Sequence, residues 1–219
     1  MKTSIITTVI ASLMLITSNV YSQKKNVLDY YKMLDVSQEY KITKSGETYQ
    51  TIGITEEPFD VVVDFKNGYI EIKDEGTGGG ILFYQVVLYR KADGSALIAM
   101  TTQNFDGVSE ECEIDFFVEK EGKLVSNKSK YFPGDDYFLN KFPKELSSEE
   151  KEVLPNVVNP IYDLPQNGLT INIMYAVKGY VNQENKSEFD LQQRLSKMAP
   201  VFLKWKYNKT TDQFEIVNS

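Results

Sequence analysis

The stretch that decides the fold is Phe59-Asp60-Val61-Val62-Val63-Asp64-Phe65-Lys66-Asn67-Gly68-Tyr69-Ile70-Glu71-Ile72-Lys73. Apolar and polar side chains alternate on both sides of Asn67-Gly68, which is typical of two strands that share one buried face. Asn-Gly favours a two-residue turn in which both residues have positive φ. The stretch therefore predicts a β-hairpin over residues 59–73.

A two-residue turn also fixes which residues face each other across the hairpin. The expected pairs are Lys66 with Tyr69, Phe65 with Ile70, and Val63 with Ile72. This register gathers the apolar side chains on one face of the hairpin. It also places Asp64 opposite Glu71, an unfavourable pair of like charges.

Further hairpins follow along the chain. The expected strands, most of them bounded by turns that contain Gly, Asn or Asp, are residues 81–91, 96–102, 112–119, 124–127, 169–175, 202–207 and 214–217. Within the first of these, Ile81–Leu88 is apolar on both faces apart from Gln85. A strand of this kind is covered from both sides, so we expect it at the centre of the sheet.

Helical spacing and capping signals predict short helices at three places. They are residues 27–34 behind the N-cap candidate Asn26, a helix opened by Ser147-Ser148-Glu149-Glu150 and ended by Pro155, and a helix opened by Ser187-Glu188-Phe189-Asp190 that runs to Pro200. The expected fold class is mainly β with a minor helical part. We expect an antiparallel meander of β-hairpins forming a curved sheet, a barrel or a sandwich, with two or three short helices.

Residues 1–22 resemble a secretory signal peptide. Lys2 is followed by an apolar stretch at residues 5–16, and the small residue Ser22 precedes Gln23. The stretch is too short and too polar for a membrane span, which needs about 20 apolar residues. A lipid anchor would need a cysteine after the cleavage point, and the only cysteine is Cys112. We expect cleavage near Ser22/Gln23, export to the periplasm or the cell exterior, and one mainly-β domain over residues 23–219.

Composition excludes several kinds of chemistry. The chain has no histidine, so Ser-His-Asp catalysis and histidine-ligated metals are excluded. One cysteine permits no disulfide within the chain. Cys112 alternates with apolar residues at 114, 116 and 118, so we interpret it as a core residue. The net charge of −7 and the acids interspersed among the bases argue against nucleic acid and anionic membranes as partners.

Two other segments have residues found in ligand sites, but for both a purely structural role is the better interpretation. Gly76-Thr77-Gly78-Gly79-Gly80 resembles a phosphate-binding loop in glycine content alone, because it precedes a strand and lacks the Lys-Ser/Thr ending. The oxygen-bearing side chains of Asn104, Asp106, Glu110 and Glu111 have calcium-like chemistry, but their spacing does not match an EF-hand loop. We expect no cofactor and no metal.

A proline-rich connector over residues 128–168 is the first place to look for a binding site, because long loops in compact domains are often functional. The candidate residues offer aromatic rings and acceptor oxygens, and they are Tyr131, Phe132, Asp135, Asp136 and Tyr137. We expect an exported, non-catalytic protein that binds a glycan, a peptide or a protein partner in the bacterial envelope or outside the cell. The alternatives are a paired-carboxylate hydrolase and an acidic inhibitor of a cationic enzyme.

Overall fold

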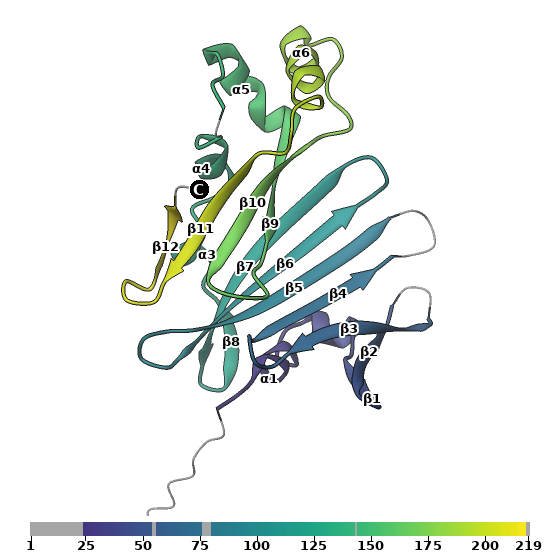
Figure 1. Cartoon of the computed structure of the whole chain (residues 1–219), viewed down its shortest axis with the longest axis vertical. Helices are drawn as coiled ribbons and strands as arrows, with labels where there is room; N and C mark the ends of the chain where they lie inside the picture. The colour runs from purple at the N-terminus through teal and green to yellow at the C-terminus, as the bar shows by residue number, and fades with distance from the viewer. Residues whose placement is uncertain (1–23, 54–55, 76–79, 143, 218–219) are drawn as a thin grey trace, which may run out of the picture.

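The computed structural model describes residues 24–53, 56–75, 80–142 and 144–217, and its strands form two antiparallel sheets (Figure 1). The larger sheet is an eight-stranded meander in which every strand pairs with its sequence neighbours. Its strands are β1 (Thr43–Ser45), β2 (Thr48–Ile52), β3 (Pro58–Asp64), β4 (Tyr69–Asp74), β5 (Ile81–Arg90), β6 (Ala96–Phe105), β7 (Glu110–Lys120) and β8 (Lys123–Ser126). The mainly antiparallel β class is confirmed.

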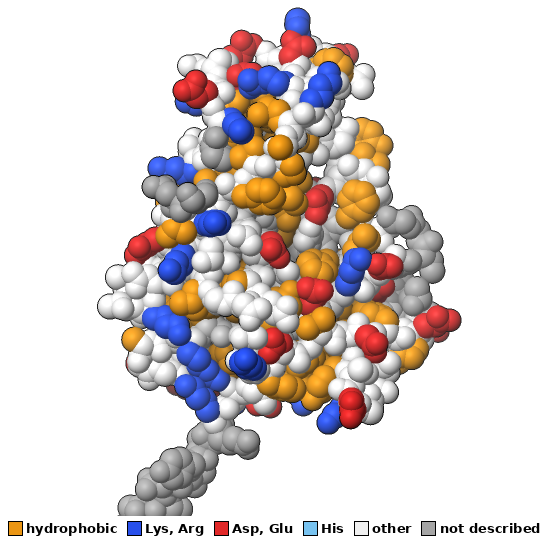
Figure 2. All heavy atoms as spheres, viewed as in Figure 1, with side chains coloured by type: hydrophobic (Ala, Val, Ile, Leu, Met, Phe, Trp, Pro, Cys, Tyr) orange, Lys and Arg blue, Asp and Glu red, His pale blue; other side chains and the backbone are white. Residues whose placement is uncertain are grey.

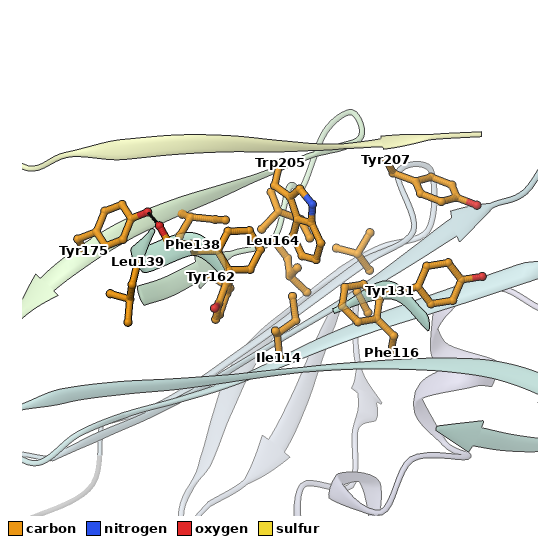
Figure 3. Close-up of a cluster of buried hydrophobic side chains, with 14 of the residues drawn as sticks. Ile114, Phe116, Tyr131, Phe138, Leu139, Tyr162, Leu164, Tyr175, Trp205 and Tyr207 are labelled. Atoms are coloured by element: carbon orange, nitrogen blue, oxygen red, sulfur yellow. Dashed lines mark hydrogen bonds between the residues drawn. The ribbon is translucent and has the colours of Figure 1, made fainter. Parts of the chain in front are cut away.

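The smaller sheet covers one face of the larger one, so the two form a sandwich. Its strands are β9 (Val158–Asp163), β10 (Thr170–Val177), β11 (Phe202–Asn208) and β12 (Gln213–Val217), in the spatial order β12-β11-β10-β9. Aromatic side chains fill the space between the sheets, as Figure 3 shows for Trp205, Phe116 and Tyr162. Trp205 packs edge-to-face on Phe116 and on Phe138, with ring centroids 5.9 and 5.0 Å apart.

A second hydrophobic cluster lies on the opposite face of the eight-stranded sheet. There α1 (Val27–Tyr31) and α2 (Val36–Glu39) supply Val27, Tyr31 and neighbouring side chains to a cluster that includes Val86. Val86 belongs to this cluster whereas the next residue, Val87, belongs to the cluster between the sheets. The central strand β5 is therefore covered on both faces, as its apolar sequence predicts.

The first hairpin forms, but the predicted register is wrong. Asp64 lies opposite Tyr69 and Val63 opposite Ile70, so the turn has four residues and Phe65 is 44% exposed. The Asp64 carboxylate accepts hydrogen bonds from the Asn67 backbone N–H at 3.0 Å and from its side-chain amide at 2.7 Å. This side-chain cap stabilises the longer turn, and Glu71 then faces Val62 instead of Asp64.

The helices begin close to the predicted caps but end at different residues. The first ends at Tyr31. Ser147 and Glu150 form a capping box at the start of α5 (Ser148–Val157), and this helix continues through Pro155. Asn185 caps α6 (Lys186–Leu195), which is why that helix begins before the predicted start. Figure 1 shows α5 and α6 side by side at one end of the molecule.

The segment predicted as a connector is largely ordered structure. It contains α3 (Lys128–Tyr131), α4 (Asp135–Leu139), α5 and strand β9. Two predictions lie outside the described residues: the signal peptide at 1–22 and most of the glycine-rich loop at 76–79. Over the described residues, the structure contains no helix long and apolar enough to cross a membrane.

Cys112 is partly buried beside the cluster between the sheets. The backbone N–H of Tyr162 in β9 points at its Sγ at 3.5 Å. Burial is the main cause that raises the pKa of this thiol, to about 12. A thiol held protonated in this way is a packing group and a poor nucleophile.

Candidate ligand-binding groove

The inward face of the eight-stranded sheet changes from apolar to polar along its strands. The pairing of β4, β5, β6 and β7 aligns side chains in rows, and the row beneath the smaller sheet is Tyr69, Val87, Ala99 and Phe116. The next row is Glu71, Gln85, Thr101 and Ile114, and the row after it is Lys73, Phe83, Gln103 and Cys112. Polar groups thus occupy positions where strand alternation places core residues.

Gln85 is the centre of this polar region and is only 3% exposed. Its amide nitrogen donates to the Tyr69 hydroxyl at 3.1 Å and to Asp163 Oδ1 at 2.9 Å. Its amide oxygen accepts from the Leu164 backbone N–H at 2.9 Å and from the Thr101 hydroxyl at 3.3 Å. All the hydrogen-bonding capacity of the buried amide is used, so Gln85 fixes the end of β9 against the larger sheet.

Two carboxylates are held at either end of this network. Tyr69 donates its hydroxyl to Glu71 Oε2 at 2.5 Å. Burial, and then the hydrogen bond to Glu71, raises the pKa of Tyr69, so the hydroxyl stays protonated and remains a donor. Asp163 accepts from Gln85 on one oxygen, and the Asn172 amide lies 3.4 Å from the other. Three hydrogen bonds in series therefore connect Glu71 to Asp163.

These residues line an open groove of about 590 Å³ at the place where the end of β9 meets the larger sheet. We call it the polar groove. Its lining includes the two carboxylates, Lys204, Phe83 and four side-chain amides, those of Gln85, Gln166, Asn167 and Asn172. Figure 2 shows this face of the molecule, where charged and hydrophobic side chains lie beside one another. The groove offers planar acceptors and donors beside an aromatic surface.

The residues predicted as a site do not come together on one surface. Tyr131 is 4% exposed, and its hydroxyl donates to Asp212 at 3.0 Å and accepts from Lys91 at 2.7 Å. Phe132 packs edge-to-face on Tyr162 in the cluster between the sheets. Both rings therefore contribute to the core.

The other three predicted residues belong to α4. The Asp135 carboxylate accepts a hydrogen bond from the Tyr162 hydroxyl, which links α4 to β9. Asp136 is exposed, and Tyr137 is 39% exposed with Lys141 Nζ 6.0 Å from its ring centre. Of the five predicted site residues, Asp135, Asp136 and Tyr137 are exposed.

The residues considered for calcium do not form a coordinating cluster in the described part of the chain. Asp106 accepts hydrogen bonds from the backbone N–H groups of Val108 and Ser109, so it caps the β6–β7 turn. Among the described residues, no group of three Asp, Glu, His or Cys side chains is placed to hold a metal ion.

Sequence reasoning missed the polar groove, although two signals of it are present in the sequence. Gln85 interrupts an otherwise apolar central strand, and Glu71 occupies an alternating position that faces the core once the register is known. Asp163 gave no such signal, because it lies in the segment interpreted as a connector. A buried glutamine at the centre of a sheet is the pattern that points to this kind of network.

No family model matches the chain, and no curated protein matches it. Among solved structures, the chain is similar to a domain of an uncharacterized protein from Porphyromonas gingivalis W83. The two are 14% identical, with a TM-score of 0.46, over 70% of this chain and 82% of that chain.

Proposed function

We propose that this is an exported, non-catalytic protein that binds a glycan in the polar groove. The observation that carries the proposal is the network centred on Gln85, which holds Glu71 and Asp163 in fixed positions on a face that packing would otherwise make apolar. Sugar hydroxyls both donate and accept hydrogen bonds, and carboxylate and amide side chains match them in pairs. The C–H face of a sugar ring packs on an aromatic ring, which Phe83 supplies.

The side chains that line the groove favour a glycan over a peptide as the ligand. Extended peptides commonly bind by adding a strand to an exposed sheet edge, where backbone groups give the affinity. The polar groove is lined by side chains from strand faces, among them Glu71 of β4 and Asn172 of β10. Ligands in such a groove are recognised by side-chain groups, as hydroxyl-rich molecules are.

Export is supported by the sequence of residues 1–22, with its positive start, apolar stretch and small residue before Gln23. Expression of the full chain in a bacterial host tests it. We expect the exported protein to begin within a few residues of Gln23 and to carry no lipid. An intact Met1 on exported protein, or a mass increase that matches an acyl chain, would contradict this part of the proposal.

The binding site is tested by calorimetric titration of the exported protein with neutral tetrasaccharides of hexoses and N-acetylhexosamines. Asp163→Asn and Glu71→Gln keep an acceptor for Gln85 and Tyr69 but remove the charge. A hydrogen bond to a charged group contributes about 1.5–3 kcal/mol, so each variant should bind at least tenfold more weakly. The matched control is Asp60→Asn on β3, since Asp60 also accepts one amide hydrogen bond, from Gln50 at 3.0 Å.

The outcomes of this titration are distinct. Weakened binding by both groove variants, with Asp60→Asn unchanged, supports the polar groove. Equal affinity in all four proteins means that the glycan binds elsewhere, and failure of every tetrasaccharide to bind rejects the function. Melting temperatures within a few degrees of the wild type show that the variants are folded.

A paired-carboxylate hydrolase is the second candidate, because Glu71 and Asp163 lie on one groove. Both carboxylates accept hydrogen bonds from fixed donors, which suits binding better than proton donation. The same tetrasaccharides, incubated for hours and separated by chromatography, decide between the two functions. Cleavage that disappears in Glu71→Gln or Asp163→Asn would replace the binding proposal with a hydrolase.

A further inference from the structure

A second groove, of about 520 Å³, lies on the other side of the β9–β10 turn, and we call it the basic groove. Five cationic side chains line it: Lys24, Lys25, Lys66, Arg90 and Lys209. None of the described residues in its lining is Asp or Glu. Figure 2 shows Lys and Arg side chains gathered at the lower left of the molecule, near the point where the chain enters the fold. In a chain of net charge −7, such a cluster is unexpected.

Most of these cations have no acidic partner within the described part of the protein. Lys25 forms a salt bridge with Glu119 at 2.5 Å, whereas Lys24, Lys66, Arg90 and Lys209 form none. Like charges that share a groove repel one another, and a bound anion removes that repulsion.

Arg90 is held in place by its surroundings. Its guanidinium lies 5.8 Å from the centre of the Tyr30 ring and donates a hydrogen bond to the Lys25 backbone carbonyl. The remaining guanidinium N–H groups keep a defined direction, which suits a planar oxyanion such as a carboxylate or an ester of phosphate or sulfate.

The basic groove adjoins the polar groove. In the β9–β10 turn, Asn167 lines the polar groove and Gly168 lines the basic one. On the larger sheet, Tyr69 lines the polar groove and its neighbour Gly68 lines the basic one. Gln166 donates to Asp64 Oδ2 at 3.3 Å, so the β9–β10 turn is tied to the β3–β4 turn at the boundary between the two. One extended ligand can therefore contact both grooves.

We propose that the basic groove binds the anionic groups of an acidic glycan whose uncharged units lie in the polar groove, an inference that rests on the proposed function. The acids Glu71 and Asp163 repel anionic groups, and the basic groove attracts them, so the ligand has one orientation. A nucleic acid fits less well, because its dense charge meets the repulsion of a protein with net charge −7.

The inference is tested with three probes at low ionic strength: a tetrasaccharide of galacturonic acid, the galactose tetrasaccharide, and an oligothymidylate with the same number of charges. The test variant is Lys66→Gln with Lys209→Gln, since both side chains are exposed. The control variant is Lys44→Gln with Lys123→Gln, which removes the same charge from exposed positions outside the grooves. Calorimetry gives the affinity of each protein for each probe.

We expect the acidic tetrasaccharide to bind at least tenfold more tightly than the neutral one, and the test variant to lose about tenfold of that affinity. The control variant should lose less than threefold in affinity for the acidic tetrasaccharide. Added salt should weaken the binding of the acidic tetrasaccharide but not that of the neutral one. Equal losses in the two variants, or no preference for the acidic probe, would overturn the inference. Competition by the oligothymidylate at equal affinity would replace the acidic glycan with a nucleic acid as the partner.

The two proposals fail in different ways. The test variant should bind the neutral tetrasaccharide as the wild type does, because Lys66 and Lys209 do not line the polar groove. If the neutral tetrasaccharide binds and the acidic one binds no more tightly, the inference about the basic groove fails and the proposed function stands. If Glu71→Gln and Asp163→Asn leave the affinity for the neutral probe unchanged, the proposed function fails first.

Discussion

Replacement of Gly68 by alanine should destabilise the fold by about 2–3 kcal/mol. Gly68 has φ of 70°, a left-handed conformation that costs a residue with a side chain about 1 kcal/mol. A Cβ atom at this position would also lie 3.1 Å from Leu88 Cβ and 3.2 Å from the Leu88 backbone oxygen. Because Leu88 belongs to the central strand β5, the crowding has little room to relax and should add about 1–2 kcal/mol.

Gly46 provides the matched control. Its φ is 61°, nearly the same as that of Gly68, and a Cβ atom there would meet no heavy atom within 4 Å. Gly46→Ala therefore measures the conformational penalty without the contact with Leu88. It should cost about 1 kcal/mol, and the difference between the two variants isolates the crowding at β5.

Urea unfolding measures both variants, with the fluorescence of Trp205 as the signal. Trp205 is the only tryptophan of the chain and is 2% exposed, so its emission should change when the two sheets separate. The midpoint should fall for both variants, more for Gly68→Ala, while the slope of the transition stays the same. Equal midpoints for the two variants would refute the argument from the Leu88 contact.

Three further predictions concern individual side chains. Cys112, whose pKa burial raises to about 12, should react with thiol reagents at pH 8 only after unfolding, and rapid modification of native protein would contradict its burial. Burial alone would raise the pKa of Asp212, but hydrogen bonds, chiefly from Lys130 and Tyr207, lower it to about 2. The stabilisation is present above pH of about 4 and is lost as the pH falls toward 2, so Asp212→Asn should cost about 1–2 kcal/mol at pH 7 and nothing near pH 2 in urea unfolding. Tyr131→Ala should cost about 3–5 kcal/mol by the same measurement because the ring is buried, whereas Tyr137→Ala should cost under about 1 kcal/mol; equal losses would reject this assignment of the two rings.

The sequence predicts the strands β3–β8 and β10–β12, because alternation and turn residues are local signals. It predicts the hairpin at Asn67-Gly68 but not its register, since the cap made by the Asp64 carboxylate outweighs the preference of Asn-Gly for a two-residue turn. It misses β1 and β2, whose side chains are mostly polar and exposed, and β9, whose Pro160 is unusual within a strand and which packs on the distant strand β7. Apolar alternation thus identifies hairpins that bury one face, and it fails for exposed hairpins and for long-range packing.

The grooves are harder to predict because separate segments build them. The cations of the basic groove come from the start of the described chain, the β3–β4 turn, the end of β5 and the β11–β12 turn. Asp64 lies two residues before Lys66 in the sequence, but its carboxylate accepts hydrogen bonds from Asn67 and does not line the groove. Charge patterning along a chain therefore does not report clustering in space.

The meander topology has a consequence for how the chain acquires its structure. Each strand from β2 to β8 pairs with the strand just before it, so a chain that emerges N-terminus first can add each of them to a strand already in place. The smaller sheet is also a meander, but it follows the larger one in the chain, and β9 begins it by packing on β7 and hydrogen-bonding to it through Asn159. We expect the larger sheet to form first, with the row of Tyr69, Val87, Ala99 and Phe116 exposed to water until strands β9–β12 cover it.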